Sequence, residues 1–213
     1  MKYTIAIMDE ELKERGKFVN FFEEEFNVIE IPFVSSVDEL IEMIKSEKID
    51  AIAIDYKLKD HKSKFTENGD FFFKQLISRL PDYPSFVLTQ DSEKAKKESK
   101  LIKSRFIIDK KILHSQIIKE TDDFKFEVLQ EIETYRNLFD DKVKRLKVLE
   151  TNRLANDLDA NLENEYIRLN NEIALSVTGH ETLPMKYFSL ETSKKLDDII
   201  SKTDELIKKI SKK

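Results

Sequence analysis

The sequence predicts an α/β protein in which a five-stranded parallel sheet is followed by an all-α region. In the first half of the chain, short apolar runs alternate with segments of helical spacing. This alternation is typical of parallel sheets, because parallel neighbours need crossover connections. The second half contains helically spaced apolar residues and no strand-like run. With only three glycines and four prolines, the composition also favours a helix-rich chain.

The predicted strands are short apolar runs, most of them followed by a polar side chain. They cover residues 3–8, 27–34, 51–54, 85–88 and 106–108. The third is a continuous apolar run rather than an alternating one, which indicates a strand covered on both faces. Pro32 in the second run fits an edge position or a strand end, because proline cannot donate a hydrogen bond to a neighbouring strand. The sequence therefore predicts a doubly wound sheet.

The segments between these strands have the features of helices. The first has apolar residues at roughly helical spacing. The second begins with a capping box formed by Ser36 and Glu39, and the third follows the turn signal Asn68-Gly69. The fourth is short and strongly basic. The four predicted helices cover residues 12–26, 36–48, 70–80 and 92–100.

Side chains with distinct chemistry follow four of the strands. They are Asp9 and Glu10 after the first, Asp55 after the third, Thr89 after the fourth, and Lys110 or Lys111 after the fifth. The carboxyl ends of strands in an open α/β sheet line the crevice where ligands bind, so these residues are candidates for a site. The alternative for each is an ordinary solvated strand end or turn, where Asp and hydroxyl residues are common.

In this order and at these intervals, the four strand ends resemble the receiver domain of two-component response regulators, over residues 2–120. The resemblance implies a flavodoxin-like fold and phosphorylation of Asp55 in a Mg²⁺-dependent reaction, with Thr89 and Lys110 at the phosphoryl group. Gly69 also stands where receivers carry a glycine after the phosphorylation loop. The partner would be a histidine kinase or another phosphodonor. Any enzyme activity would be limited to self-phosphorylation and dephosphorylation at the aspartate.

The residue types suit this chemistry on physical grounds as well. Mg²⁺ prefers hard oxygen ligands, so Asp9, Glu10 and Asp55 could supply a carboxylate site. Asp55 would attack the phosphoryl group as a nucleophile, and Lys110 would neutralise charge on the phosphoryl oxygens. Thr89 would donate a hydrogen bond to one of those oxygens, which in receivers repacks the surface near the fourth helix and fifth strand.

Three features depart from the receiver pattern. The loop after Asp55 is long and has no proline, and Lys110 is followed by Lys111 where receivers carry proline. The aromatic residue expected three positions before the lysine is replaced by Ile107, with Phe106 one position further back. These departures favour a second hypothesis, a pseudo-receiver that acts as a scaffold or interaction protein without phosphorylation.

Residues 121–213 are predicted to form a separate helical output or interaction domain. A heptad-like apolar stripe indicates a helical hairpin or the seam of a coiled-coil dimer. Its members are Val128, Ile132, Tyr135, Phe139, Leu146 and Leu149. A last amphipathic helix is expected over 196–210, and the simplest alternative is a three-helix packing unit. We expect this region to bind a partner protein or a second copy of the chain.

Composition narrows the remaining functions. The chain carries 37 Lys and Arg against 42 Asp and Glu, and its helical second half has no basic stripe, so a DNA-binding regulator is a weaker hypothesis. The sequence shows no Gly-rich phosphate loop, which disfavours a metabolic enzyme. It contains no cysteine, no signal-peptide-like start and no apolar run near the roughly 18 residues needed to span a bilayer. We therefore expect a cytoplasmic protein without a membrane partner.

Overall fold

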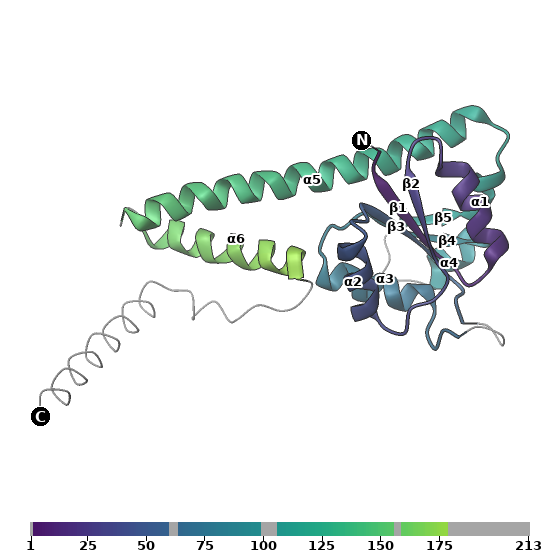
Figure 1. The fold of residues 1–213 in the computed structure, drawn as a ribbon, viewed down its shortest axis with the longest axis horizontal. Coiled ribbons are helices and arrows are strands. Elements are labelled where there is room, and N and C mark those ends of the chain that lie inside the picture. Colours follow the sequence, from purple (N-terminus) through teal and green to yellow (C-terminus); the bar gives the residue numbers. More distant parts are fainter. Residues whose placement is uncertain (1, 60–63, 99–105, 156–158, 179–213) are drawn as a thin grey trace, which may run out of the picture. The chain divides into compact units, whose positions relative to one another are not determined.

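The computed structural model describes residues 2–59, 64–98, 106–155 and 159–178 (Figure 1). Contacts divide the chain into two units, Met1–Asn137 and Leu138–Lys213. The first unit contains the sheet and its covering helices, and the second is helical throughout its described part. Helix α5, Ile118–Leu154, contributes residues to both units.

The first unit is built on a five-stranded, all-parallel sheet with the strand order β2-β1-β3-β4-β5. The strands are β1 (Thr4–Met8), β2 (Asn27–Ile31), β3 (Ala51–Asp55), β4 (Ser85–Thr89) and β5 (Ile107–Asp109). This topology confirms the predicted fold class. The direction of strand succession reverses at β1, so a crevice opens between the carboxyl ends of β1 and β3.

Helices cover both faces of the sheet. On one face lie α1 (Leu12–Phe22), the short 3₁₀ helix η2 (Lys110–His114) and the first turns of α5; on the other lie α2 (Val37–Ser46), α3 (Gly69–Arg79) and α4 (Ser92–Glu98). Side chains along a strand alternate between the faces. Ile5 and Ile7 therefore join the core under α1 and α5, whereas Ala6 and Met8 join the core under α2 and α3. Burial on both sides explains the continuous apolar runs.

Two predicted elements end earlier than expected. The second strand ends at Ile31, directly before Pro32, which has no N–H to extend the ladder. The first helix ends at Phe22 rather than at residue 26. Phe26 is buried in the turn that follows and packs edge-on against Phe22 at a centroid distance of 5.5 Å. The apolar residue at position 26 therefore marks a core contact and not a further turn of the helix.

The predicted heptad stripe is divided between the two units. Val128 and Ile132 are fully buried in the core beneath α1 and α5, together with Phe22 and Phe86. The prediction of a coiled-coil seam is therefore wrong for these two residues. Their spacing of four correctly marked one face of a helix, but that face packs on the chain's own sheet.

In the second unit, the C-terminal part of α5 and helix α6 (Ala160–Thr178) form an antiparallel hairpin. Arg145 makes a bidentate ion pair with Glu165, with nitrogen–oxygen distances of 2.6 and 2.9 Å. One helical turn earlier on α5, Lys142 lies 3.1 Å from Glu172, which is further along α6. Because the partners advance in opposite directions along the two helices, the helices run antiparallel.

The predictions of a last helix and of no membrane-spanning segment can be compared only with the residues that the structure describes. The last predicted helix, 196–210, lies outside them, so the three-helix alternative stays a prediction. Within those ranges, no helix combines the length and the apolar character needed to cross a bilayer.

The start of α3 lies directly against the end of β3. Gly69 donates its N–H to the carbonyl oxygen of Tyr56 at 3.1 Å. A Cβ atom at position 69 would lie 1.8 Å from the carbonyl oxygen of Asp55 and 2.9 Å from a methyl group of Ile54. Only glycine lets the two backbones approach this closely, so Gly69 helps to set the position of Asp55.

We expect Gly69→Ala to lower the free energy of unfolding by at least roughly 1–3 kcal/mol, because the added methyl group overlaps backbone that cannot move aside easily. Gly16→Ala is the matched control: Gly16 lies within α1, and a Cβ there would meet nothing within 4 Å. That change should raise stability by about 0.5–1 kcal/mol through helix propensity. Urea unfolding followed by circular dichroism measures both. Equal stability of Gly69→Ala and wild type would contradict the packing argument.

Candidate functional site

The carboxyl edge of the sheet brings the predicted site residues together. Asp9 follows β1, Asp55 ends β3, Thr89 ends β4 and Lys110 follows β5. All four are buried, with exposed fractions between 1 and 7%. Parallel strands present their carboxyl ends at one edge, which is why Lys110 contacts a residue 101 positions earlier.

A single ammonium group joins two of the strand ends. Lys110 Nζ lies 2.8 Å from Asp9 Oδ2 and 2.7 Å from Asp55 Oδ1. The side chain of Lys111 is 85% exposed, and its Nζ lies 3.8 Å from Asp109 Oδ2. The sequence left open which lysine faces the site, and the structure places Lys110 there.

The side chains at the strand ends are also held by the loops that follow them. Asp9, Asp55 and Thr89 each accept a hydrogen bond from the backbone N–H two residues further on. These bonds run from Glu11 to Asp9 Oδ1 (2.8 Å), from Lys57 to Asp55 Oδ2 (3.1 Å) and from Asp91 to Thr89 Oγ1 (3.3 Å). Such local turns are favoured by Asp and Thr and need no distant partner, so much of the site's geometry is encoded locally.

The electrostatics of the site are dominated by burial and by neighbouring acids. Burial raises the pKa of Asp55, and Asp9 raises it further against the opposing effect of Lys110. Burial alone would lower the pKa of Lys110, but the adjacent Asp55 and Asp9 carboxylates outweigh it and raise that pKa, so the ammonium stays charged. Burial, together with Asp9, Asp55 and Glu11, raises the pKa of Glu10 from 4.5 to about 7.

The acidic cluster, defined as Asp9, Glu10 and Asp55, fits a divalent cation. Ligand oxygens from the three carboxylates lie within 4.8 Å of one another. Glu10 Oε2 is buried and has no hydrogen-bond partner among the described residues. Three carboxylates facing one ammonium leave an excess of negative charge, and hard oxygen donors are the ligands that Mg²⁺ prefers. The residues that the sequence predicted as metal ligands could therefore hold such an ion.

A small cavity of about 220 Å³ opens above the acidic cluster. It is lined by Glu10, Glu11, Asp55, Lys57, Lys59, Thr89, Gln90, Asp91 and Lys110. Pockets for drug-sized ligands are larger, roughly 300–1,000 Å³, whereas a water molecule takes up about 30 Å³. The cavity therefore has room for a phosphoryl group, a cation and a few waters.

Several cavity residues were not predicted as site residues. Lys57, Lys59, Gln90 and Asp91 all belong to the loops directly after β3 and β4. Their place just beyond two strand ends is the signal that could have identified them. Two of the features that depart from the receiver pattern can be located. Ile107 is a buried core residue. The loop after Asp55 is described except for residues 60–63.

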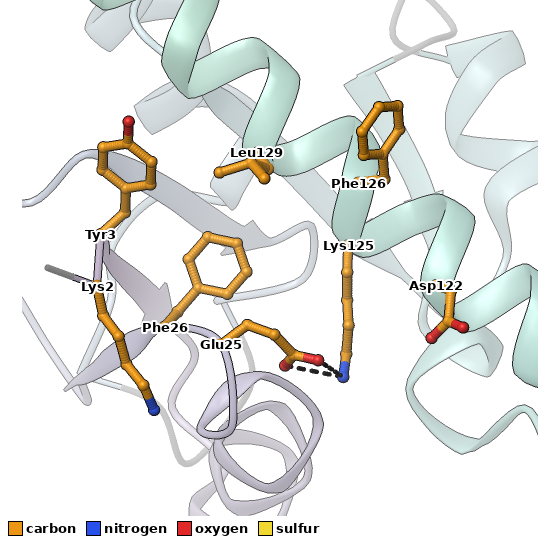
Figure 2. A pocket seen from close by; sticks show the side chains of 8 residues that line it. All are labelled: Lys2, Tyr3, Glu25, Phe26, Asp122, Lys125, Phe126 and Leu129. Carbon is orange, nitrogen blue, oxygen red and sulfur yellow. Dashed lines mark hydrogen bonds and ion pairs between the residues drawn. The ribbon is translucent and has the colours of Figure 1, made fainter.

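A second hollow of about 500 Å³ lies at the amino ends of β1 and β2, beside α5 (Figure 2). It is lined by Lys2, Tyr3, Glu25, Phe26, Asp122, Lys125, Phe126 and Leu129. Lys125 Nζ pairs with both carboxylate oxygens of Glu25, at 2.9 and 3.0 Å. Aromatic rings form much of its wall, and none of the predicted site residues line it. The predicted chemistry is therefore confined to the carboxyl edge of the sheet.

No protein-family model matches the sequence, and no curated protein matches it. Similar solved structures include adenylate cyclase from Rhodopirellula baltica, with 18% identity over 69% of this chain and 98% of that one, at a TM-score of 0.46. A response regulator receiver domain protein from Clostridium thermocellum has 16% identity over 64% and 98%, at a TM-score of 0.43. The Salmonella typhimurium RcsB response regulator has 13% identity over 86% and 96%, at a TM-score of 0.44. Similarity this distant assigns no function to the chain.

Mg²⁺ should stabilise the fold through the acidic cluster, by about 2.7 kcal/mol at a hundredfold excess over its Kd. Asp9→Asn should remove this stabilisation. Glu42→Gln, at an exposed carboxylate on α2, should leave it unchanged. Thermal unfolding with Mg²⁺ and with a chelator measures the effect. An equal Mg²⁺-induced shift in Asp9→Asn would exclude the cluster as the metal site.

Glu10 should also give the metal-free protein a distinctive pH dependence. Between pH 4.5 and about 7 the folded state holds a proton on Glu10 that the unfolded state has lost. The contribution of Glu10 to the free energy of unfolding therefore falls as pH rises through this window. In chelator, the stability of Glu10→Gln relative to wild type should rise from pH 4.5 to 7. A difference that stays constant with pH would show that Glu10 is not buried as an acid.

Proposed function

We propose that this chain is a signalling protein of the response-regulator type, which accepts a phosphoryl group on Asp55. The observation that carries the proposal is the position of Lys110, whose ammonium group lies within 2.8 Å of both Asp55 and Asp9. The same edge of the sheet holds the acidic cluster and the hydroxyl group of Thr89. Phosphoryl transfer needs a nucleophile, positive charge near the phosphoryl oxygens and a hydrogen-bond donor. Asp55 would be the nucleophile, Lys110 and a Mg²⁺ at the acidic cluster would supply the positive charge, and Thr89 would be the donor.

In the reaction, a carboxylate oxygen of Asp55 attacks the phosphorus atom and forms a new P–O bond. The bond between phosphorus and the donor breaks, and the leaving group departs with its electron pair. Mg²⁺ bound at the acidic cluster supplies charge neutralisation for the phosphoryl oxygens. Lys110 donates to a phosphoryl oxygen from the position where it now meets Asp55, and Thr89, which also lines the cavity, donates its O–H.

The size of the cavity matches the transferred group. A space of about 220 Å³ admits a phosphoryl group with little of the donor around it. We therefore expect a donor that presents its phosphoryl group at the end of a protruding side chain or on a small molecule. A phosphohistidine of a histidine kinase and a small acyl phosphate both meet this requirement, and any activity of the chain itself would be self-phosphorylation and dephosphorylation.

Thr89 provides a route from the phosphoryl group to the protein surface. Its Oγ1 accepts a hydrogen bond from the N–H of Asp91. Asp91 in turn caps α4, because its carboxylate accepts from Lys94 N and its carbonyl from Ala95 N, both at 3.0 Å. Reorientation of the Thr89 hydroxyl toward a phosphoryl oxygen would disturb this cap, so α4 would respond to phosphorylation.

The helical second unit is proposed to bind another protein or a second copy of the chain. Leu138 and Val148 of α5 each expose 51% of their surface. Each is an apolar side chain of the hairpin that is available for contact with a partner. The expectation that DNA is not a partner stays a prediction, as does a cytoplasmic location.

Phosphorylation can be tested with acetyl phosphate and Mg²⁺, followed by intact-mass spectrometry. The wild-type chain should gain the mass of one phosphoryl group. Asp55→Asn should not, because an amide oxygen is a poor nucleophile. Lys110→Ala should react roughly 10²–10³-fold more slowly, and the exposed neighbour change Lys111→Ala should react normally. Thr89→Ala should still be modified but should lose the response of α4, measured by amide hydrogen exchange.

Beryllofluoride with Mg²⁺ provides the control for slow small-donor chemistry, because it imitates the acyl phosphate without turnover. If neither reagent perturbs a folded wild-type chain, receiver chemistry is absent. The pseudo-receiver hypothesis would then replace the proposal.

Self-association through the second unit predicts an oligomer in light scattering of the full chain. Leu138→Glu combined with Val148→Glu should weaken that oligomer at least roughly tenfold, because two apolar side chains that become buried in the oligomer would be replaced by charged ones. The matched control is Leu12→Glu, at a side chain that is 71% exposed at the start of α1. A wild-type chain that is monomeric and captures no partner protein would reject this role.

A further inference from the structure

A buried arginine on α1 holds the backbone of Asp9. Arg15 is 8% exposed, and its NH1 donates a hydrogen bond of 2.8 Å to the carbonyl oxygen of Asp9. Its Nε lies 3.0 Å from Glu30 Oε2 on the edge strand β2. One guanidinium group therefore connects α1, the end of β1 and β2.

This contact acts where the sheet's own hydrogen bonds run out. The pairing of β1 ends at Met8, opposite Ile31 on one side and Ile54 on the other. The next N–H, that of Asp9, reaches Ile31 O at 3.3 Å, which is long for a backbone hydrogen bond. The carbonyl of Asp9 is held by Arg15 at the shorter distance of 2.8 Å. Arg15 thus fixes the backbone one residue beyond the end of β1, at Asp9, which carries the most buried carboxylate of the site.

Fold stability alone gives no reason for an arginine at this position. A buried charge loses its hydration, and replacing buried ion pairs by apolar residues of similar volume is often neutral or stabilising. The partner, Glu30, keeps 42% of its side chain exposed, so the pair is only partly sheltered from water. The fork of the guanidinium instead suits a role in geometry, because it holds two acceptors in fixed directions at once.

We infer that Arg15 is a positioning residue for the metal site. By holding the backbone of Asp9, it keeps the Asp9 carboxylate beside Lys110 and within the acidic cluster, without contributing a ligand itself. The inference rests on the proposed function in so far as that function requires a cation at the cluster. Residues that orient metal ligands are worth about 10–100-fold in metal affinity, which sets the expected size of the effect.

Mg²⁺ binding by the full chain, measured by isothermal titration calorimetry, tests the inference. Arg15→Met keeps the apolar stem but removes the donors, and its Kd for Mg²⁺ should rise at least about tenfold. Arg136→Met is the matched control. Arg136 pairs with Asp50, which holds Thr4 N at 2.8 Å at the opposite, amino end of the strands. This control should lower the melting temperature and leave the Kd for Mg²⁺ unchanged.

Two further variants keep the test decisive. Arg15→Lys retains the charge but not the fork, and should give an intermediate Kd. Glu30→Ala removes the acceptor that orients the guanidinium, at a half-exposed position, and should also weaken Mg²⁺ binding. This variant decides the test if Arg15→Met does not fold. The inference is overturned if Arg15→Met binds Mg²⁺ as wild type does, or if Arg136→Met loses as much affinity. It is equally overturned if Glu30→Ala is unchanged while Arg15→Met is unfolded.

The outcome is separable from that of the proposed function. A wild-type chain that binds Mg²⁺ but accepts no phosphoryl group would refute phosphorylation, and the Kd values would still decide the role of Arg15. A wild-type chain that binds no Mg²⁺ would refute the metal site and the positioning role together.

Discussion

The ion pairs between Lys110 and the two aspartates are the interaction on which the candidate site depends. Three charged groups lie buried at the carboxyl edge of the sheet, and burying an ion costs several kcal/mol unless partners compensate it. The partners compensate only in part, because Glu10 adds a third carboxylate with a buried oxygen that has no described hydrogen-bond partner. The site is thus held together by a cation of the chain and still carries an excess of negative charge. That imbalance is the physical basis for expecting both a divalent cation and a reaction at Asp55.

The sheet topology converts this local chemistry into a connected structure. Because β1 and β3 are neighbours, Asp9 and Asp55 face each other across the switch point, and β5 reaches the same edge to deliver Lys110. Close packing of Gly69 against the Asp55 carbonyl connects α3 to Asp55, and the hydrogen bond from Asp91 N–H to Thr89 connects the site to α4. A change in charge at this edge of the sheet would therefore act on residues that are directly connected to α3 and α4.

The second unit is stabilised differently. Its described ion pairs lie on exposed or half-exposed side chains, such as Arg145 with Glu165, where water screens the attraction between the charges. Burial of Leu149 and Ile167 supplies its apolar contacts. A hairpin of this kind has little stability to spare compared with the two-sided core of the sheet. Such a balance agrees with the proposal that the region gains contacts from a partner.

The sequence by itself determined the fold class and the chemistry at the strand ends. Periodicity separates strands from helices, and the residue after a buried strand must lie at the sheet edge, so Asp9, Asp55 and Thr89 could be predicted as neighbours. The tertiary structure decided what periodicity does not encode. The direction of the chain at the start of η2 turned Lys110 inward and Lys111 outward. Val128 and Ile132 pack on the sheet. Their helical spacing in the sequence shows that one face of the helix is buried, but it does not show which surface covers that face. Arg15 was one charged residue among many until the fold placed it against the Asp9 carbonyl, because a hydrogen bond to a backbone atom leaves no mark on residue type.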